Sequence, residues 1–139
     1  DSYSDAFDVV IIDCNDAVGT SAPLFEEAFY QSIAKVLKEG GVCSILAGAM
    51  LDAEFLCAVR TKISKYLGKT VCSRLTMPSY HGGEFVFMMA TKSNVISEVD
   101  LQVLQDRQTT RGIETSYWSP AMHFASQVFA PSSPLGGVK

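Results

Sequence analysis

The sequence has little of what marks a membrane, secreted or nucleic-acid-binding protein. Lysine and arginine together number 11 against 15 aspartates and glutamates, a net charge of -4, whereas binding to nucleic-acid phosphates depends on clustered basic side chains. No apolar run approaches the roughly 20 residues that a membrane-spanning helix needs. The first residues also lack the basic start and apolar stretch of a signal peptide. We therefore predict a cytoplasmic protein whose partners include neither nucleic acid nor membrane.

Patterns typical of metal sites and disulfide frameworks are absent as well. The four cysteines stand singly along the chain without a CxxC pair, and there are only two histidines. Zinc sites and disulfide frameworks are recognised by closely spaced sets of these residues. We predict no metal and no disulfide, and we expect the cysteines to be mostly buried, reduced thiols. They are Cys14, Cys43, Cys57 and Cys72.

What the chain does have is an alternation of strand-like and helix-like segments. Its 139 residues are 47% apolar, which suits one globular domain with a core. The expected order is a strand with its apolar part at residues 9–12, a helix capped by Thr20 or Ser21 and ended by Gly40-Gly41, a strand at 42–47, a helix at 52–67, and strands at 71–77 and 84–91 joined by a loop. This order predicts an α/β fold with flanking helices and a mostly parallel sheet, with one antiparallel strand near the edge.

The two ends of the sequence carry further expectations. The apolar run at residues 9–12 is typical of a strand covered on both faces, yet few residues precede it, so neighbours on one side are expected to lie outside this sequence. Ser97 with Asp100 resembles a capping box and predicts a short helix through about Arg107. Residues 131–139 are expected to form a loose tail, which leaves residues 1–130 as the domain.

Two acidic residues, Asp13 and Asp16, follow the first strand. In parallel sheets flanked by helices, ligands collect at the carboxyl ends of the strands. Two carboxylates at that edge can hold a cationic amine by charge-assisted hydrogen bonds and accept a proton from it. The alternative interpretation is structural: Asp13 caps the turn and Asp16 is a solvated loop residue.

Several separated motifs resemble those of one enzyme family. Residues 5–19 (DAFDVVIIDCNDAVG), followed by LF at 24–25 and FY at 29–30, are similar to a segment of the polyamine aminopropyltransferases, above all spermidine synthase. Later motifs keep that family's order: LKEGGV at 37–42, MPSY at 77–80 with Gly83, and YWSP at 117–120 with His123. The resemblance spans about residues 5–129 and corresponds to the carboxyl-terminal half of the family's chain.

The resemblance implies a Rossmann-like fold of the methyltransferase type. It also implies transfer of an aminopropyl group from decarboxylated S-adenosylmethionine to putrescine, which yields spermidine and methylthioadenosine. The partners would be this diamine and the nucleoside donor, with the donor as a co-substrate, no permanently bound cofactor and no metal. Full-length relatives are usually dimers, so a homodimer or association with a full-length subunit is expected.

The same resemblance assigns roles to individual residues. Asp13 matches the family's proton acceptor. The diamine would be bound by residues of the acidic loop and by one tyrosine beyond it: Asp16, Cys14, Asn15 and Tyr80. The nucleoside donor would be held by residues after the loop: Thr20, Ser21, Ala22 and Leu24.

The chain departs from the family in its second strand. There the family delivers a glutamine and then a glutamate toward the diamine, whereas residues 46–49 of this chain read LAGA. The loss of one hydrogen-bond partner in a buried polar site costs about 1 to 3 kcal/mol. The family's glycine-rich nucleotide loop has no counterpart in this sequence either. Two alternatives remain: a non-catalytic truncated or degenerate paralogue that acts as a partner subunit, and a small-molecule methyltransferase with the same fold.

Overall fold

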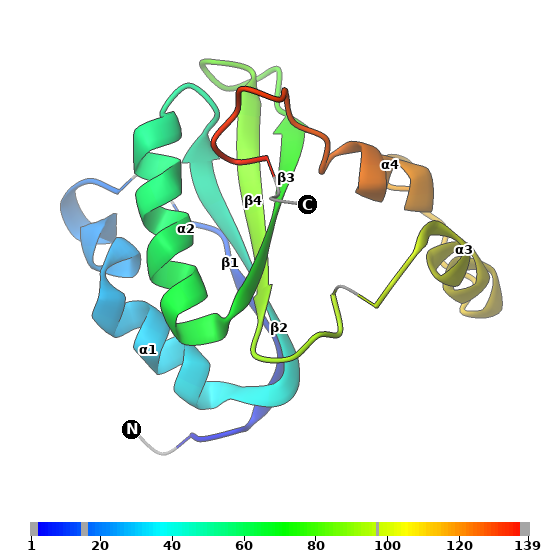
Figure 1. Ribbon diagram of the computed structural model, residues 1–139, viewed down its shortest axis with the longest axis horizontal. Helices are drawn as coiled ribbons and strands as arrows, with labels where there is room; N and C mark the ends of the chain where they lie inside the picture. The colour runs from blue at the N-terminus through cyan, green and yellow to red at the C-terminus, as the bar shows by residue number, and fades with distance from the viewer. Residues whose placement is uncertain (1–2, 15–16, 97, 137–139) are drawn as a thin grey trace.

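The computed structural model describes residues 3–14, 17–96 and 98–136 (Figure 1). The elements follow in the order β1 (Phe7–Ile12), the 3-10 helix η1 (Gly19–Phe25), α1 (Glu27–Val36), β2 (Leu37–Ala49), α2 (Ala53–Leu67), β3 (Lys69–Thr76), β4 (Glu84–Thr91), α3 (Leu101–Thr110) and α4 (Pro120–Ala125). The predicted alternation of strand and helix, closed by a pair of strands, is confirmed. Within the described residues, no helix combines the length and apolar character needed to cross a membrane.

The strands form one sheet in the order β1-β2-β4-β3. β1 runs parallel to β2, whereas β4 lies antiparallel to both of its neighbours. The prediction of an α/β fold with one antiparallel strand near the edge is therefore confirmed. The turn between β3 and β4 makes the expected hairpin, with Thr76 paired with Glu84.

The core lies between the sheet and the helices α1 and α2, which cover one face of it (Figure 1). Along β2 and β4, alternate residues point into this layer, as the two-residue period of a strand requires. The buried strand residues are Cys43, Ile45, Ala47, Val86, Met88 and Ala90. The helices supply residues at helical spacing: Tyr30, Ile33, Leu56, Val59, Ile63 and Leu67.

The prediction that the first strand is covered on both faces is wrong for the described structure. β1 lies at the edge of the sheet. Val10 and Ile12 pack against the core, while Val9 is 58% and Ile11 is 75% exposed. The physical reason is the alternation of side chains: one set meets α1 and α2, and no described element covers the other.

The start and end of α1 also differ from the prediction. Neither Thr20 nor Ser21 caps it, because both lie in η1, which includes Pro23. The chain then extends at Glu26, whose side chain makes no capping hydrogen bond, and α1 begins at Glu27. The helix ends at Val36 rather than at Gly40, because Leu37 already pairs with Phe7 of β1.

The segments after β4 contain the predicted short helix, α3, and two features that the sequence did not predict. Asp100 caps α3, since its carboxylate accepts a hydrogen bond from the Val103 amide at 2.8 Å, and Ser97 lies outside the described residues. The short helix α4 was not predicted, although Ser119 caps it and Pro120 occupies its first turn. Within the expected tail, Leu135 is only 1% exposed and belongs to the core.

The cysteines are all free thiols. Cys43 and Cys72 are buried, as predicted, whereas Cys14 and Cys57 are half-buried. Burial raises the pKa of Cys43 to about 12, so this thiol stays protonated and acts as a small apolar core residue.

Candidate functional site

Asp13 and Tyr80 line the same cavity, although they are far apart in the sequence. Asp13 directly follows β1, whose last residue Ile12 pairs with Ile45 of β2. Tyr80 lies in the turn between β3 and β4. The cavity has a volume of about 550 Å³ and opens beside the carboxyl ends of β1 and β2. Asp13 thus lies at the carboxyl end of β1, the kind of sheet edge at which the sequence predicts ligand binding.

Local hydrogen bonds hold Tyr80 at the cavity. The Met77 amide donates to the Gly83 carbonyl at 2.7 Å, and the Tyr80 amide donates to the Met77 carbonyl at 3.0 Å. Gly83 has φ of +69°, a conformation that glycine adopts without a steric penalty. The ring of Tyr80 lies 5.4 Å from that of Phe85, so the tyrosine is anchored by its body while 59% of it remains exposed.

An irregularity in β2 shapes the wall of the cavity. The pairing of β2 with β4 shifts between Leu46 and Gly48, where the strand carries a bulge. Gly48 has φ of +144°, and a Cβ atom there would approach the ring of Phe55 to 3.6 Å. Bulges of this kind often re-aim side chains next to binding sites. Here Leu46 becomes part of two adjacent cavities.

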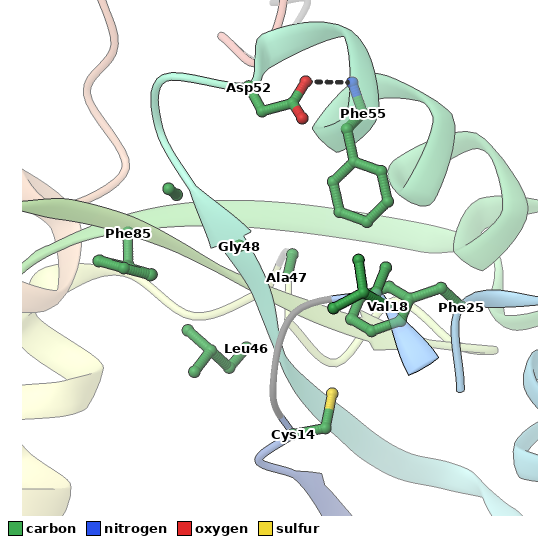
Figure 2. Close-up of a pocket in the computed structure, with 11 residues that line it drawn as sticks. Cys14, Val18, Phe25, Leu46, Ala47, Gly48, Asp52, Phe55 and Phe85 are labelled. Carbon is green, nitrogen blue, oxygen red and sulfur yellow. Dashed lines mark hydrogen bonds between the residues drawn. The ribbon is translucent and has the colours of Figure 1, made fainter. Parts of the chain in front are cut away.

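The second cavity lies between the bulge, the start of α2 and the end of η1 (Figure 2). Its volume is about 300 Å³. Phe25 and Phe55 supply an aromatic wall, with ring centroids 5.5 Å apart. Figure 2 shows Cys14 at one end of this cavity and Asp52, at the start of α2, at the other.

Cys14 is not suited to act as a nucleophile. Its burial, and secondarily the negative charge of Asp13, raise the pKa of its thiol above the ordinary value. A nucleophilic cysteine needs the opposite shift, because only the thiolate attacks. Cys14 therefore contributes to the walls of both cavities as an uncharged side chain.

The structure brings together only some of the residues singled out in the sequence. Asp13, Cys14 and Tyr80 line one cavity. Asn15 and Asp16 lie outside the described residues. The four positions expected at the nucleoside belong to η1 and line neither cavity: Thr20, Ser21, Ala22 and Leu24.

Sequence reasoning missed other lining residues. Phe85 stands in an apolar strand, whose pattern indicates core packing, and Asp52 stands at the start of a predicted helix, where aspartate commonly serves as a cap. Asp52 does cap α2, accepting a hydrogen bond from the Phe55 amide at 3.1 Å, and it also lines the second cavity. The one available signal was that Asp52 closely follows the carboxyl end of a strand.

No metal centre emerges from the part of the chain that the structure describes. Among those residues, no group of three or more histidine, cysteine, aspartate or glutamate side chains is positioned to hold an ion. The larger cavity offers the carboxylate of Asp13, the phenol of Tyr80, the imidazole of His81 and apolar walls. Such a set can bind a cation through the acid and contact its hydrocarbon part through the walls.

Comparisons with known proteins identify relatives of this chain. The chain is 32% identical over 124 residues to a polyamine aminopropyltransferase of Yersinia pestis, and equally to one of Yersinia pseudotuberculosis. Each match covers 88% of this chain and 42% of the relative. The chain thus spans less than half the length of the curated relatives it matches.

Solved structures of spermidine synthases are also similar to this chain. The chain superposes on a spermidine synthase in complex with the transition-state analogue AdoDATO with a TM-score of 0.80 and 28% identity, covering 92% of this chain and 43% of that one. For the spermidine synthase of Thermotoga maritima the TM-score is 0.76, also at 28% identity. The predicted Rossmann-like fold is thereby confirmed. Residues 1–102 match the spermine/spermidine synthase domain, and the chain belongs to this family of polyamine aminopropyltransferases.

Proposed function

We propose that this chain carries the amine-handling part of a spermidine synthase-like aminopropyltransferase. The reaction would move an aminopropyl group from decarboxylated S-adenosylmethionine to putrescine. The observation that carries the proposal is that Asp13 and Tyr80 line one cavity of about 550 Å³ at the strand ends. Membership of the family and the likeness to a spermidine synthase bound to AdoDATO support the same reaction.

Asp13 is assigned the role of proton acceptor. An alkylammonium has no free electron pair, so it must lose a proton before its nitrogen can attack. The Asp13 carboxylate takes that proton as the nitrogen forms a bond to the carbon next to the sulfonium. The carbon-sulfur bond breaks, and its electron pair stays on sulfur, which leaves the neutral thioether methylthioadenosine.

Other residues would position the two substrates. Tyr80, which lines the same cavity as Asp13, would offer its hydroxyl to the diamine. Asp16, outside the described residues, is assigned an ammonium group by resemblance. Cys14 and Asn15 complete this assignment to the diamine. The nucleoside donor is assigned to residues of η1: Thr20, Ser21, Ala22 and Leu24. Alignment of two bound substrates accounts for much of the rate of such a transfer.

Calorimetry of the 139-residue chain tests the proposal. Putrescine is titrated into the protein in the presence of methylthioadenosine, with a full-length family member as the positive control. Asp13→Asn should weaken putrescine binding by about 10- to 150-fold, because a hydrogen bond to a charged group is lost. Asp8→Asn is the matched control, since Asp8 lies on β1, the strand that Asp13 follows, is exposed and pairs with Lys38 at 2.8 Å.

Two results would contradict the proposal. If Asp13→Asn binds putrescine as tightly as the unchanged chain, the carboxylate has no role in amine binding. If a well-folded chain binds neither ligand, the acidic residues are remnants of the family site and the chain acts through association with another subunit. The oligomeric state, proposed to be a homodimer or a complex with a full-length subunit, is measured on the same sample by light scattering.

A further inference from the structure

A separate cavity lies between α2, the first part of β3 and the segment that follows α4. Its volume is about 250 Å³, and its lining includes Arg60, residues 69–72, Gln127 and Leu135. It shares no lining residue with the two cavities at the strand ends. Among the described residues that line it, two are cationic and none is acidic. We call it the donor cavity, because it is rich in hydrogen-bond donors.

Arg60 is a cation that lacks an acidic partner in the described part of the chain. Its side chain belongs to a half-buried residue of α2, and none of the ion pairs formed by the described residues includes it. A guanidinium has five N–H donors, yet the hydrogen bond that it makes to a described residue is a long one of 3.5 Å to the Leu135 carbonyl. Arg60 therefore has donors and a charge available for an anion.

Lys69 adds a second positive charge to the same cavity. It is the exposed first residue of β3, and it too is absent from the ion pairs of the residues that the structure describes. The whole chain has a net charge of -4, so the local excess of positive charge does not follow from the composition. Two cations without an acid favour a ligand with two negative charges.

The open edge of β3 supplies backbone donors. β3 pairs with β4 alone, and the Arg74 amide points to the other side, where it donates to the Ser126 carbonyl at 2.7 Å. Because amides alternate in direction along an antiparallel strand, those of Thr70 and Cys72 point to the same outer edge. The carbonyls of these residues point there as well, so the two cations must provide most of the affinity for an anion.

The amides of Thr70 and Cys72 are placed where water has little access. The two residues are only 9% and 5% exposed, and within the described ranges neither amide donates to a backbone carbonyl outside the sheet. Buried amides in native proteins nearly always have an acceptor. An anion in the donor cavity would supply one.

We infer that the donor cavity binds a small, doubly charged oxyanion, namely a phosphate group. The planar fork of arginine matches phosphate oxygens, and lysine binds phosphate as a point charge. The volume of about 250 Å³ lies below the roughly 300 to 1,000 Å³ of pockets for drug-sized ligands. Inorganic phosphate or a small phosphate ester therefore suits it. The site is independent of the proposed amine transfer, because it contains none of the residues assigned to that reaction.

A chemical-shift titration of the 139-residue chain, labelled with ¹⁵N, tests the inference. Sodium phosphate is added at constant ionic strength, which sodium chloride maintains. Saturable shifts are expected at the amides of Thr70 and Cys72, and none at Tyr80 in the cavity of Asp13. Methyl phosphate, titrated separately, shows whether an ester binds more tightly than the inorganic ion. Sodium acetate tests a singly charged carboxylate, which should bind more weakly.

Three substitutions assign the binding to the donor cavity. Arg60→Gln should weaken phosphate binding by about 10- to 150-fold, because hydrogen bonds to a charged group are lost. Lys69→Gln, at an exposed position, should weaken it by about 2- to 5-fold. Arg107→Gln is the matched control and should keep the affinity, because Arg107 is exposed on α3 and does not line the cavity. Circular dichroism and urea unfolding establish that the variants are folded.

Three results would overturn the inference. Phosphate produces no saturable shift at Thr70 and Cys72, or Arg60→Gln and Lys69→Gln both keep the affinity of the unchanged chain, or acetate binds as tightly as phosphate. A loss of affinity in Arg107→Gln equal to that in Arg60→Gln would likewise assign the response to the overall charge rather than to the cavity. None of these results bears on putrescine binding, which depends on Asp13 under the proposed function.

Discussion

The two faces of the sheet are built from neighbouring residues of the same strands, yet they differ in how they are covered. On the face toward α1 and α2, Ile45 and Met88 are 1% and 0% exposed. On the opposite face, Ser44 and Met89 are half-buried, and Ile11 of β1 is 75% exposed. Met88 and Met89 are the same residue type, so their different exposure comes from the helices that cover only one face of the sheet.

The two cavities lie beside the carboxyl ends of β1 and β2. Figure 1 shows α1 and α2 packed on one side of the sheet, while α3 and α4 lie away from β1 on the other. At the carboxyl end of β2, the strand carries a bulge between Leu46 and Gly48. Leu46 lines both cavities, while the neighbouring Ala47 is only 1% exposed. The helices α1 and α2 thus bury one set of strand residues, while the residues of the opposite face remain partly exposed.

The largest expected effect comes from truncating neighbouring methionines on the two faces. Met88→Ala should lower the free energy of unfolding by about 2 to 5 kcal/mol, because it removes a fully buried side chain and leaves a cavity. Met89→Ala should lower it by roughly half as much or less, because part of that side chain already contacts water. Urea denaturation measures both. Equal losses would mean that the second face is as tightly packed as the first.

A smaller effect is expected at the junction of α1 and β4. The Lys92 ammonium donates hydrogen bonds to the carbonyls of Ala34 and Leu37, at 3.2 and 2.7 Å, and so satisfies the end of α1. Lys92→Met should reduce the free energy of unfolding by about 1.5 to 3 kcal/mol.

The matched substitution is Lys38→Met. Lys38 pairs with Asp8 at 2.8 Å, but the two side chains are 45% and 79% exposed. Loss of such a surface pair should change the free energy of unfolding by at most about 1 kcal/mol. If the two lysine variants are equally unstable in thermal unfolding, the partly buried hydrogen bonds of Lys92 are not what secures α1.

The smallest expected effect is a pH dependence of the free energy of unfolding that comes from His123 in α4. His123 of α4 is half-buried beside Trp118 and Phe124, and this burial lowers the pKa of its imidazole. Between the folded pKa and the ordinary value near 6.5, the unfolded chain binds more protons than the folded one. The stabilisation is therefore complete above about pH 6.5 and is lost as the pH falls through the lowered folded pKa.

Urea unfolding at pH 7.5 and at pH 5.5 measures this loss. His123→Gln should flatten the dependence, because glutamine does not titrate in this range. His81→Gln, in the exposed hairpin loop, controls for the removal of an imidazole elsewhere on the surface. A dependence that persists unchanged in His123→Gln would assign the loss of stability to other groups.

Much of the fold could be predicted from the sequence because its signals are local. Asp52 and Gly68 mark the two ends of α2, and the continuous apolar run at residues 85–90 identifies β4. The limits of α1 could not be predicted in this way. The helix ends early because Leu37 pairs with β1, a contact between segments far apart in the sequence.

Residues of the candidate site likewise differ in whether a local sequence signal could identify them. Asp13 was found because an acidic residue after an apolar strand marks the edge where ligands bind. For Phe85 and Asp52 the sequence indicates only structural roles, because strand packing accounts for the phenylalanine and helix capping for the aspartate. Both residues line the smaller cavity because of the bulge in β2 and the packing of α2, and neither feature has a local signature in the sequence.

By itself, then, the sequence determined the alternation of strands and helices, the acidic end of the first strand and the resemblance to the aminopropyltransferases. These properties follow from hydrophobic periodicity, capping and local motifs, which act between residues close together along the chain. Only the tertiary structure decided which face of each strand is covered, that Asp13 and Tyr80 line one cavity, and that Asp52 lines a second cavity beside it. Such contacts depend on strand order, register and helix packing, which bring distant residues together.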